Sequence, residues 1–159
     1  MIDEEAKKTV LRLFNYVLVV VTMPGPDGGH GYTANWVAQA AFEPPMVTMT
    51  AENDSKAIGL LREHRVFAIN VLASGQRELA GQLGRRSRTH PDKFRGVATE
   101  PGVTGCPLLL DALGYLECRV AGELPAGDHT LFLGEVVAAG VRRTGAPLTM
   151  AETGFRYFG

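Results

Sequence analysis

The spacing of hydrophobic and polar positions predicts a series of short helices and β-branched strands. Apolar residues recur at helical intervals in three segments, residues 2–14, 54–65 and 74–84. Asp54 or Ser55 is a suitable N-cap for the second of these helices. Segments that are rich in β-branched residues, or that alternate strictly, predict five strands: residues 16–23, 46–52, 66–72, 115–124 and 129–141.

The order of these elements favours a mostly antiparallel β fold. Residues 125–128, with the sequence PAGD, are expected to join the last two long strands as a hairpin. Late hairpins do not suit a doubly wound parallel sheet, but they suit a small barrel or sandwich with helices at its edge. A length of 159 residues fits a single domain, residues 1–159, with a core of its own.

Charge and hydropathy narrow the classes of function. The formal net charge of -1 gives no electrostatic drive toward nucleic acid or an anionic membrane. The longest apolar run, from Tyr16 to Val21, is too short to span a bilayer. The N-terminal sequence MIDEEAKK lacks the apolar region of a signal peptide. We therefore expect a cytoplasmic protein with no nucleic-acid or membrane partner.

The cysteines and histidines are not spaced as metal ligands. Cys106 and Cys118 match no zinc or redox motif, so we expect two reduced thiols, with Cys118 packed in a strand. His30, His64 and His90 are expected to be surface residues. No metal site is predicted.

A glycine-rich stretch after the first strand admits several interpretations. Residues 29–34, GHGYTA, fit the G-x-G-x-x-G/A pattern of a dinucleotide-binding turn, and Glu52 follows a later strand at about the expected distance. However, five turn residues precede the motif, and a Pro-Pro pair would end the required helix early. The stretch also suits a strand and edge loop, in which Thr33, Asn35 and Trp36 bind a planar heterocycle such as an isoalloxazine. In a third interpretation Trp36 only packs in the core.

Five segments in combination resemble a known family. YVLVVVT, GYTANWVAQAAFEPPMV, NDSKAIGLLREHRVFAINVL, DKF and GDHTLFLGEV follow one another between residues 16 and 136. Together they resemble the flavin reductase-like family, whose fold is the FMN-binding split barrel. The resemblance implies a mostly β fold, an antiparallel split β-barrel with flanking helices. It also implies a homodimer with flavin sites at the subunit interface.

The resemblance further implies the roles of particular residues in this chain. One set of residues is implied to line the flavin ring: Thr33, Ala34, Asn35 and Trp36. A second set is implied to hold the flavin phosphate: Glu52, Asn53, Asp54, Ser55 and Lys56. Ser55 suits this role on physical grounds too, because free N–H groups and the dipole at a helix N-terminus attract anions. Lys93 and Phe94 are implied to approach the flavin from a loop or from the neighbouring subunit. Asp128 and His129 are implied to contact the nicotinamide substrate, and Tyr157 to close the site.

Three positions depart from the family pattern. Ala38, Ala41 and Ala57 stand where the family often has hydroxyl residues, and this loss is expected to weaken flavin binding. The basic cluster of Arg85, Arg86 and Arg88, together with Lys93, is a candidate for compensation because guanidinium groups bind phosphate bidentately. Alternatively, this cluster is a solvated loop.

The implied activity is reduction of FMN or FAD by NADH or NADPH, with reduced flavin passed to a partner monooxygenase. Hydride transfer between two stacked rings requires no side-chain acid or base, so orientation by His129 is expected rather than a catalytic group. One alternative is an electron-transfer flavoprotein that keeps FMN tightly bound and acts with a protein partner. Another is a split-barrel module for a different planar cofactor, such as haem.

Overall fold

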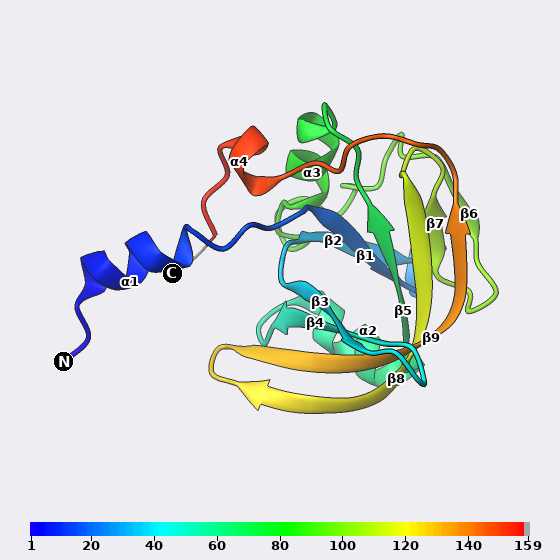
Figure 1. Ribbon diagram of the computed structural model, residues 1–159. Coiled ribbons are helices and arrows are strands. Elements are labelled where there is room, and N and C mark those ends of the chain that lie inside the picture. Colours follow the sequence, from blue (N-terminus) through cyan, green and yellow to red (C-terminus); the bar gives the residue numbers. More distant parts are fainter. Residues whose placement is uncertain (158–159) are drawn as a thin grey trace.

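The structure, a computed structural model, describes residues 1–157 (Figure 1). Its helices are α1 (Glu4–Leu11), α2 (Lys56–His64), α3 (Arg77–Leu83) and α4 (Met150–Thr153), with a 3-10 turn at Pro26–Gly28. Its first five strands are β1 (Val19–Met23), β2 (His30–Ala34), β3 (Val37–Ala41), β4 (Met46–Glu52) and β5 (Val66–Val71). The remaining strands are β6 (Thr99–Pro101), β7 (Pro107–Leu109), β8 (Gly114–Ala126) and β9 (His129–Val141). Within residues 1–157, no helix is long and apolar enough to cross a membrane.

Seven strands form one antiparallel sheet in the order β2-β1-β5-β8-β9-β4-β3. Strands β2 and β3 are therefore opposite edges of the sheet, yet only Asn35 and Trp36 separate them along the chain. A two-residue link can join the two edges only if the sheet curls back on itself. The Tyr32 hydroxyl on β2 donates to the Thr50 carbonyl on β4 at 2.9 Å, which also ties the two sides together. The predicted mostly β, antiparallel fold with flanking helices is confirmed.

The long hairpin of β8 and β9 supports both halves of the curled sheet (Figure 1). β8 pairs with β5 on one side and β9 pairs with β4 on the other, while register shifts near Cys118 and Val120 bend the hairpin. Gly127 in the turn has a φ of 66°, a conformation that glycine adopts without strain. The predicted hairpin at residues 125–128 is thus present.

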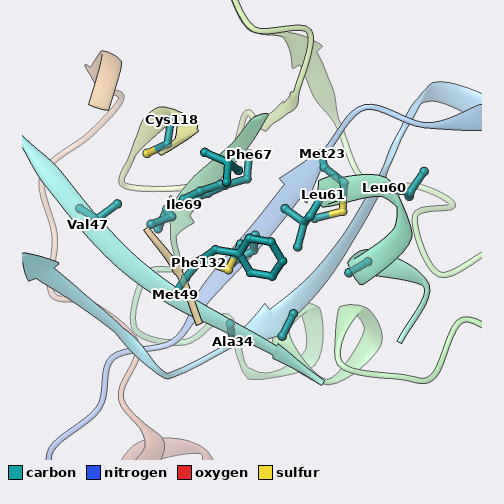
Figure 2. Close-up of a cluster of buried hydrophobic side chains, with 14 of the residues drawn as sticks. Met23, Ala34, Val47, Met49, Leu60, Leu61, Phe67, Ile69, Cys118 and Phe132 are labelled. Carbon is teal, nitrogen blue, oxygen red and sulfur yellow. The ribbon is translucent and has the colours of Figure 1, made fainter. Parts of the chain in front are cut away.

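The main core fills the inside of the curled sheet (Figure 2). Phe132, Met49 and Phe67 are fully buried, and Leu61 of α2 packs among them. A Cβ atom at Gly134 would lie 2.4 Å from Phe67 Cζ, so the absence of a side chain there makes room for the aromatic ring. This cluster joins β1, β4, β5, β9 and α2 into one packed unit.

A second cluster covers the opposite face of β1. Leu18 and Val20 pack there with Leu83 of α3 and with Leu148 from the C-terminal segment. All five residues of β1 are buried as a result, which explains its continuous apolar sequence.

A small β6–β7 sheet, which the hydrophobic pattern did not predict, packs against β5 and β1, and the loop between its strands covers Glu117 of β8. Glu117 is only 1% exposed. Its carboxylate accepts hydrogen bonds from the backbone N–H groups of Val103 and Thr104 and from the Thr104 hydroxyl, at 2.6–3.2 Å. The buried carboxyl group thus holds the loop between β6 and β7 in place.

Several expectations are corrected by the fold. No helix follows the GHGYTA stretch, which forms β2 and leads directly into β3, so the dinucleotide-binding interpretation is wrong. His30 is 7% exposed rather than on the surface. The first helix is shorter than predicted, has no buried residue, and projects from the body of the molecule (Figure 1).

Replacement of Phe67 by Ala tests whether this core carries the stability of the fold. The fully buried ring should leave a cavity that costs about 3–5 kcal/mol of unfolding free energy, measured by urea denaturation. Phe42→Ala is the matched control because Phe42 is 89% exposed, and it should change stability by less than about 0.5 kcal/mol. Equal losses in the two variants would contradict this description of the core.

Candidate functional site

A cavity of about 840 Å³ opens where the two edges of the sheet meet. Its walls come from β2, the Asn35–Trp36 link, the end of β4, the start of α2, α3 with the loop that follows it, and the C-terminal segment. The size is in the range of cofactor sites, and both apolar and charged side chains line it.

Most of the residues singled out from the sequence meet in this cavity. Those that line it are Thr33, Ala34, Asn35, Trp36, Glu52, Asp54, Ser55, Lys56, Arg86, Lys93, His129 and Tyr157. The cavity lining does not include Asn53, Phe94 or Asp128. Asn53 instead holds the β8–β9 turn through a bond to the Gly127 carbonyl at 3.0 Å, and Phe94 packs against Gly31.

An aromatic cluster of Trp36, His129 and Tyr157 forms one wall. The Trp36 ring centroid lies 4.8 Å from that of His129 and 5.0 Å from that of Tyr157. The Nδ1 atom of His129 is 2.7 Å from an Asp128 carboxylate oxygen, and Nε2 is 2.8 Å from the Tyr157 hydroxyl. Asp128 therefore orients the imidazole from outside the cavity, and the bond holds the pKa of the Asp128 carboxyl below its usual range.

Glu52 is the point where the C-terminal segment and the loop after α3 converge. The Tyr157 hydroxyl donates to Glu52 Oε1 at 2.6 Å, and burial followed by this contact raises the pKa of the phenol. Arg86 lies 3.9 Å from Glu52 Oε2 and 3.4 Å from Asp54 Oδ2. Arg86 is thus paired with two carboxylates here, which bears on its predicted role as a phosphate ligand.

Two hydrogen-bond donors in the cavity wall have no partner within residues 1–157. They are the Nδ2 group of Asn35, which is 4% exposed, and the Oγ of Ser55. Ser55 occupies the N-cap position of α2, but its side chain makes no capping bond. A buried donor without a partner costs free energy, so both groups fit a ligand that brings acceptor atoms into the cavity.

Basic groups gather near Ser55. Lys93 is 6% exposed and donates through Nζ to the carbonyls of Leu83 and Arg85, each at 3.1 Å. Burial, and to a lesser degree Lys56, lower the pKa of Lys93 to about 8. His30 also lines this part of the wall, and burial followed by the charges of Lys93 and Lys56 lowers its pKa to about 4. This concentration of positive charge suits an anion.

Of the three alanines that stand where the family often has hydroxyl residues, one lines the cavity and two do not. Ala57 is buried and lines the cavity, so a hydroxyl there would have faced a ligand. The cavity lining does not include Ala38 or Ala41, which belong to β3. Arg85 and Arg88 do line the cavity, as the compensation hypothesis requires.

The comparisons with known proteins agree with this geometry. Residues 11–159 match the family model described as "Flavin reductase like domain". The chain belongs to the flavin reductase-like family. It is 34% identical over 145 residues to the flavin reductase (NADH) of Kitasatospora aureofaciens, covering 89% of this chain and 74% of that one. It is also 31% identical to diflavin flavoprotein A 1 of Synechocystis, covering 85% of this chain but 24% of that protein.

A solved structure of the family shares the fold over the whole chain. The NADH:FAD oxidoreductase SgcE6 of Streptomyces globisporus C-1027, in complex with NAD and FAD fragments, superposes with a TM-score of 0.84 at 29% identity. The match covers 100% of this chain and 96% of that one. This flavin reductase-like chain therefore shares its fold with a relative that was solved in complex with NAD and FAD fragments.

His30 lines the cavity, although nothing in the sequence indicated it. A lone histidine on a strand gives no spacing pattern, and its role depends on two lysines that are 26 and 63 positions away along the chain. The small residues Ala80, Gly81 and Gly84 of the α3 region also line the cavity. Their close spacing in the predicted helix was an available signal for a face that accommodates a ligand.

His129→Ala tests the contact that orients the imidazole. Loss of the contact with Nδ1 should raise the pKa of Asp128 toward its ordinary value, as measured by NMR titration of the side-chain carboxyl. A carboxyl group whose pKa is lowered by folding stabilises the folded protein at pH values above its ordinary pKa. This stabilisation is lost as the pH falls through the pKa of the folded protein. The wild-type protein should therefore lose this contribution only as the pH falls below the ordinary pKa of Asp, whereas the variant should lack the contribution.

Tyr157→Phe is the control for this titration. It removes the hydroxyl from Nε2 but leaves the Nδ1 contact with Asp128, so the pKa of Asp128 should stay lowered. An equal rise in both variants would show that the C-terminal segment, rather than His129, determines the pKa of this carboxyl.

Proposed function

We propose that this protein is a flavin reductase that transfers a hydride from NADH to FMN or FAD. The observation that carries the proposal is the cavity at the joined sheet edges, where an aromatic wall, two unpartnered donors and a basic end lie together. The NADH dependence rests on the names of relatives, such as the flavin reductase (NADH) of Kitasatospora aureofaciens. When bound, the flavin would accept the hydride at N5, so the protein need only bind and orient the two rings.

The residues of the cavity fit the parts of a flavin. Trp36 supplies a flat aromatic face, and the unpartnered Nδ2 group of Asn35 can donate to an acceptor on the ring. Ser55, at the start of α2, can donate to a phosphate oxygen with Lys56 and Lys93 nearby. Arg86 can join them only by leaving Glu52 and Asp54.

His129 is proposed to orient the nicotinamide. The His129 ring lies within contact distance of Trp36, and Asp128 fixes the orientation of the imidazole. A nicotinamide ring that stacks beside the flavin would therefore contact Nε2. Nε2 is hydrogen-bonded to Tyr157, whose ring also lies against Trp36. Entry of the nicotinamide therefore requires the C-terminal segment to move, which fits the proposed role of Tyr157 in closing the site.

Reduced flavin that leaves this cavity can serve a partner monooxygenase, which we propose as its destination. The alternative, an electron-transfer flavoprotein with tightly bound FMN, is favoured by the similarity to diflavin flavoproteins, of which this chain spans about a quarter. Flavin that stays bound through gel filtration would favour the electron-transfer flavoprotein over the flavin reductase that releases its product. The two free cysteines agree with a reducing compartment such as the cytoplasm.

A homodimer is proposed because α1 presents an uncovered apolar face. Ile2, Val10, Leu13 and Phe14 are 54–76% exposed on or beside this projecting helix. A second copy of the chain would cover them. Light scattering should then return twice the chain mass of 17.1 kDa, and Leu13→Ser combined with Phe14→Ser should shift the mass toward the monomer. A wild-type monomer in the presence of bound flavin would contradict the proposal.

Steady-state NADH oxidation with free FMN or FAD tests the function directly. The wild-type protein should catalyse it, and His129→Ala should lower kcat/KM for NADH about threefold to tenfold, as expected for loss of one hydrogen bond worth about 0.5–1.5 kcal/mol. Flavin affinity and melting temperature should change little, because His129 is proposed to contact the nicotinamide.

His64→Ala is the matched control, since His64 is a half-buried histidine of α2 outside the cavity lining. It should leave the kinetics unchanged. If the wild-type protein oxidises no NADH with either flavin, the proposed function is wrong. If His129→Ala loses flavin binding instead, the residue belongs to the flavin side of the cavity.

A further inference from the structure

His30 is a buried titratable group that the proposed hydride transfer does not use. It lies at the start of β2, is 7% exposed, and lines the cavity. Its imidazole has no hydrogen-bond partner among the residues that the structure describes. A buried, unpaired imidazole that faces a cavity is available to a ligand.

The surroundings of His30 are positively charged. Lys93, from the segment after α3, and Lys56, at the start of α2, are the charged groups that act on it. The acidic residues of the cavity, Glu52 and Asp54, are instead paired with Arg86. Burial first, and then two lysines that no carboxylate offsets, keep the His30 ring neutral until an anion arrives.

The two lysines keep donors for such an anion. Lys93 Nζ gives two of its three N–H groups to the carbonyls of Leu83 and Arg85, which leaves one. Lys56 forms no ion pair within residues 1–157, and the buried Oγ of Ser55 adds a further unpartnered donor. The cavity that His30 lines thus offers several unused donors, while its carboxylates, Glu52 and Asp54, are paired with Arg86.

We propose that His30 completes a phosphate site with Lys56 and Lys93 and takes up one proton from solvent when a dianionic phosphate binds. This inference rests on the proposed function, since the phosphate would be that of the flavin. His30 would be neutral in the free protein and an imidazolium in the complex, so flavin binding is linked to pH through the phosphate and not through the ring.

The charge of a bound phosphate is large enough to raise the pKa of His30 into the neutral range. The pKa of His30 in the free protein is about 4. One opposite charge nearby raises the pKa of a cationic group by about one to three pKa units, and a dianion carries two such charges. Two such charges place the expected pKa of His30 in the complex between about 6 and 10, with a midpoint of about 8. Flavin phosphate affinity should then rise as the pH falls from about 8 toward 6, whereas riboflavin, which has no phosphate, should show no such dependence.

Calorimetric titration at pH 7 in two buffers of different ionisation enthalpy counts the protons directly. The wild-type protein should take up about half a proton or more per FMN and close to none per riboflavin. Lys93, with a pKa of about 8, is already mostly charged at pH 7 and contributes at most about a tenth of a proton. The FMN phosphate, with a second pKa of about 6, would release protons rather than take them up.

His30→Gln assigns the proton to this residue. The variant should lose most of the uptake and bind FMN about 3- to 30-fold more weakly, while riboflavin affinity stays unchanged and shows that the site is folded. His64→Gln is the matched control and should keep both the uptake and the affinity. Unchanged uptake in His30→Gln, or no uptake by the wild type, would overturn the inference. Failure of the wild type to bind any flavin would instead overturn the proposed function.

Discussion

The two-residue link of Asn35 and Trp36 is the constraint on which the rest of the structure depends. Because it joins opposite edges of a seven-stranded sheet, the sheet must curl, and the inside of the curl becomes the core around Phe132 and Phe67. The same link leaves the edges unpaired to each other, so the end of β4, the start of α2 and the C-terminal segment can converge there. The cavity is thus a consequence of how the sheet closes.

Charge is distributed unevenly around this cavity. The carboxylates of Glu52 and Asp54 are held by Arg86, and Glu52 also accepts from Tyr157, so negative charge is neutralised near the aromatic wall. Lys56 and Lys93, near Ser55, have no carboxylate partner within residues 1–157. A ligand with a neutral planar ring and an anionic tail, which describes a flavin mononucleotide, is complementary to both parts.

Local patterns predicted much of the fold. Strands 46–52 and 129–141 have the predicted bounds because β-branched residues and clear turn signals mark them. The β6–β7 pair was missed because each strand has only three residues, and the burial of Glu117 depends on that pair. Sequence neighbours that were expected to act together, as at residues 33–36, line one cavity. Contacts between distant segments, such as the bond between Tyr157 and Glu52, leave no local pattern.

The flavin ring is expected to lie against Trp36, and fluorescence of this residue tests that placement most directly. Trp36 is the single tryptophan of the chain, so its emission reports on this wall of the cavity alone. Titration with riboflavin or FMN should quench the emission saturably, with the same dissociation constant that equilibrium dialysis gives. Flavin binding in dialysis that leaves Trp36 emission unchanged would contradict the account, because the ring would then lie elsewhere.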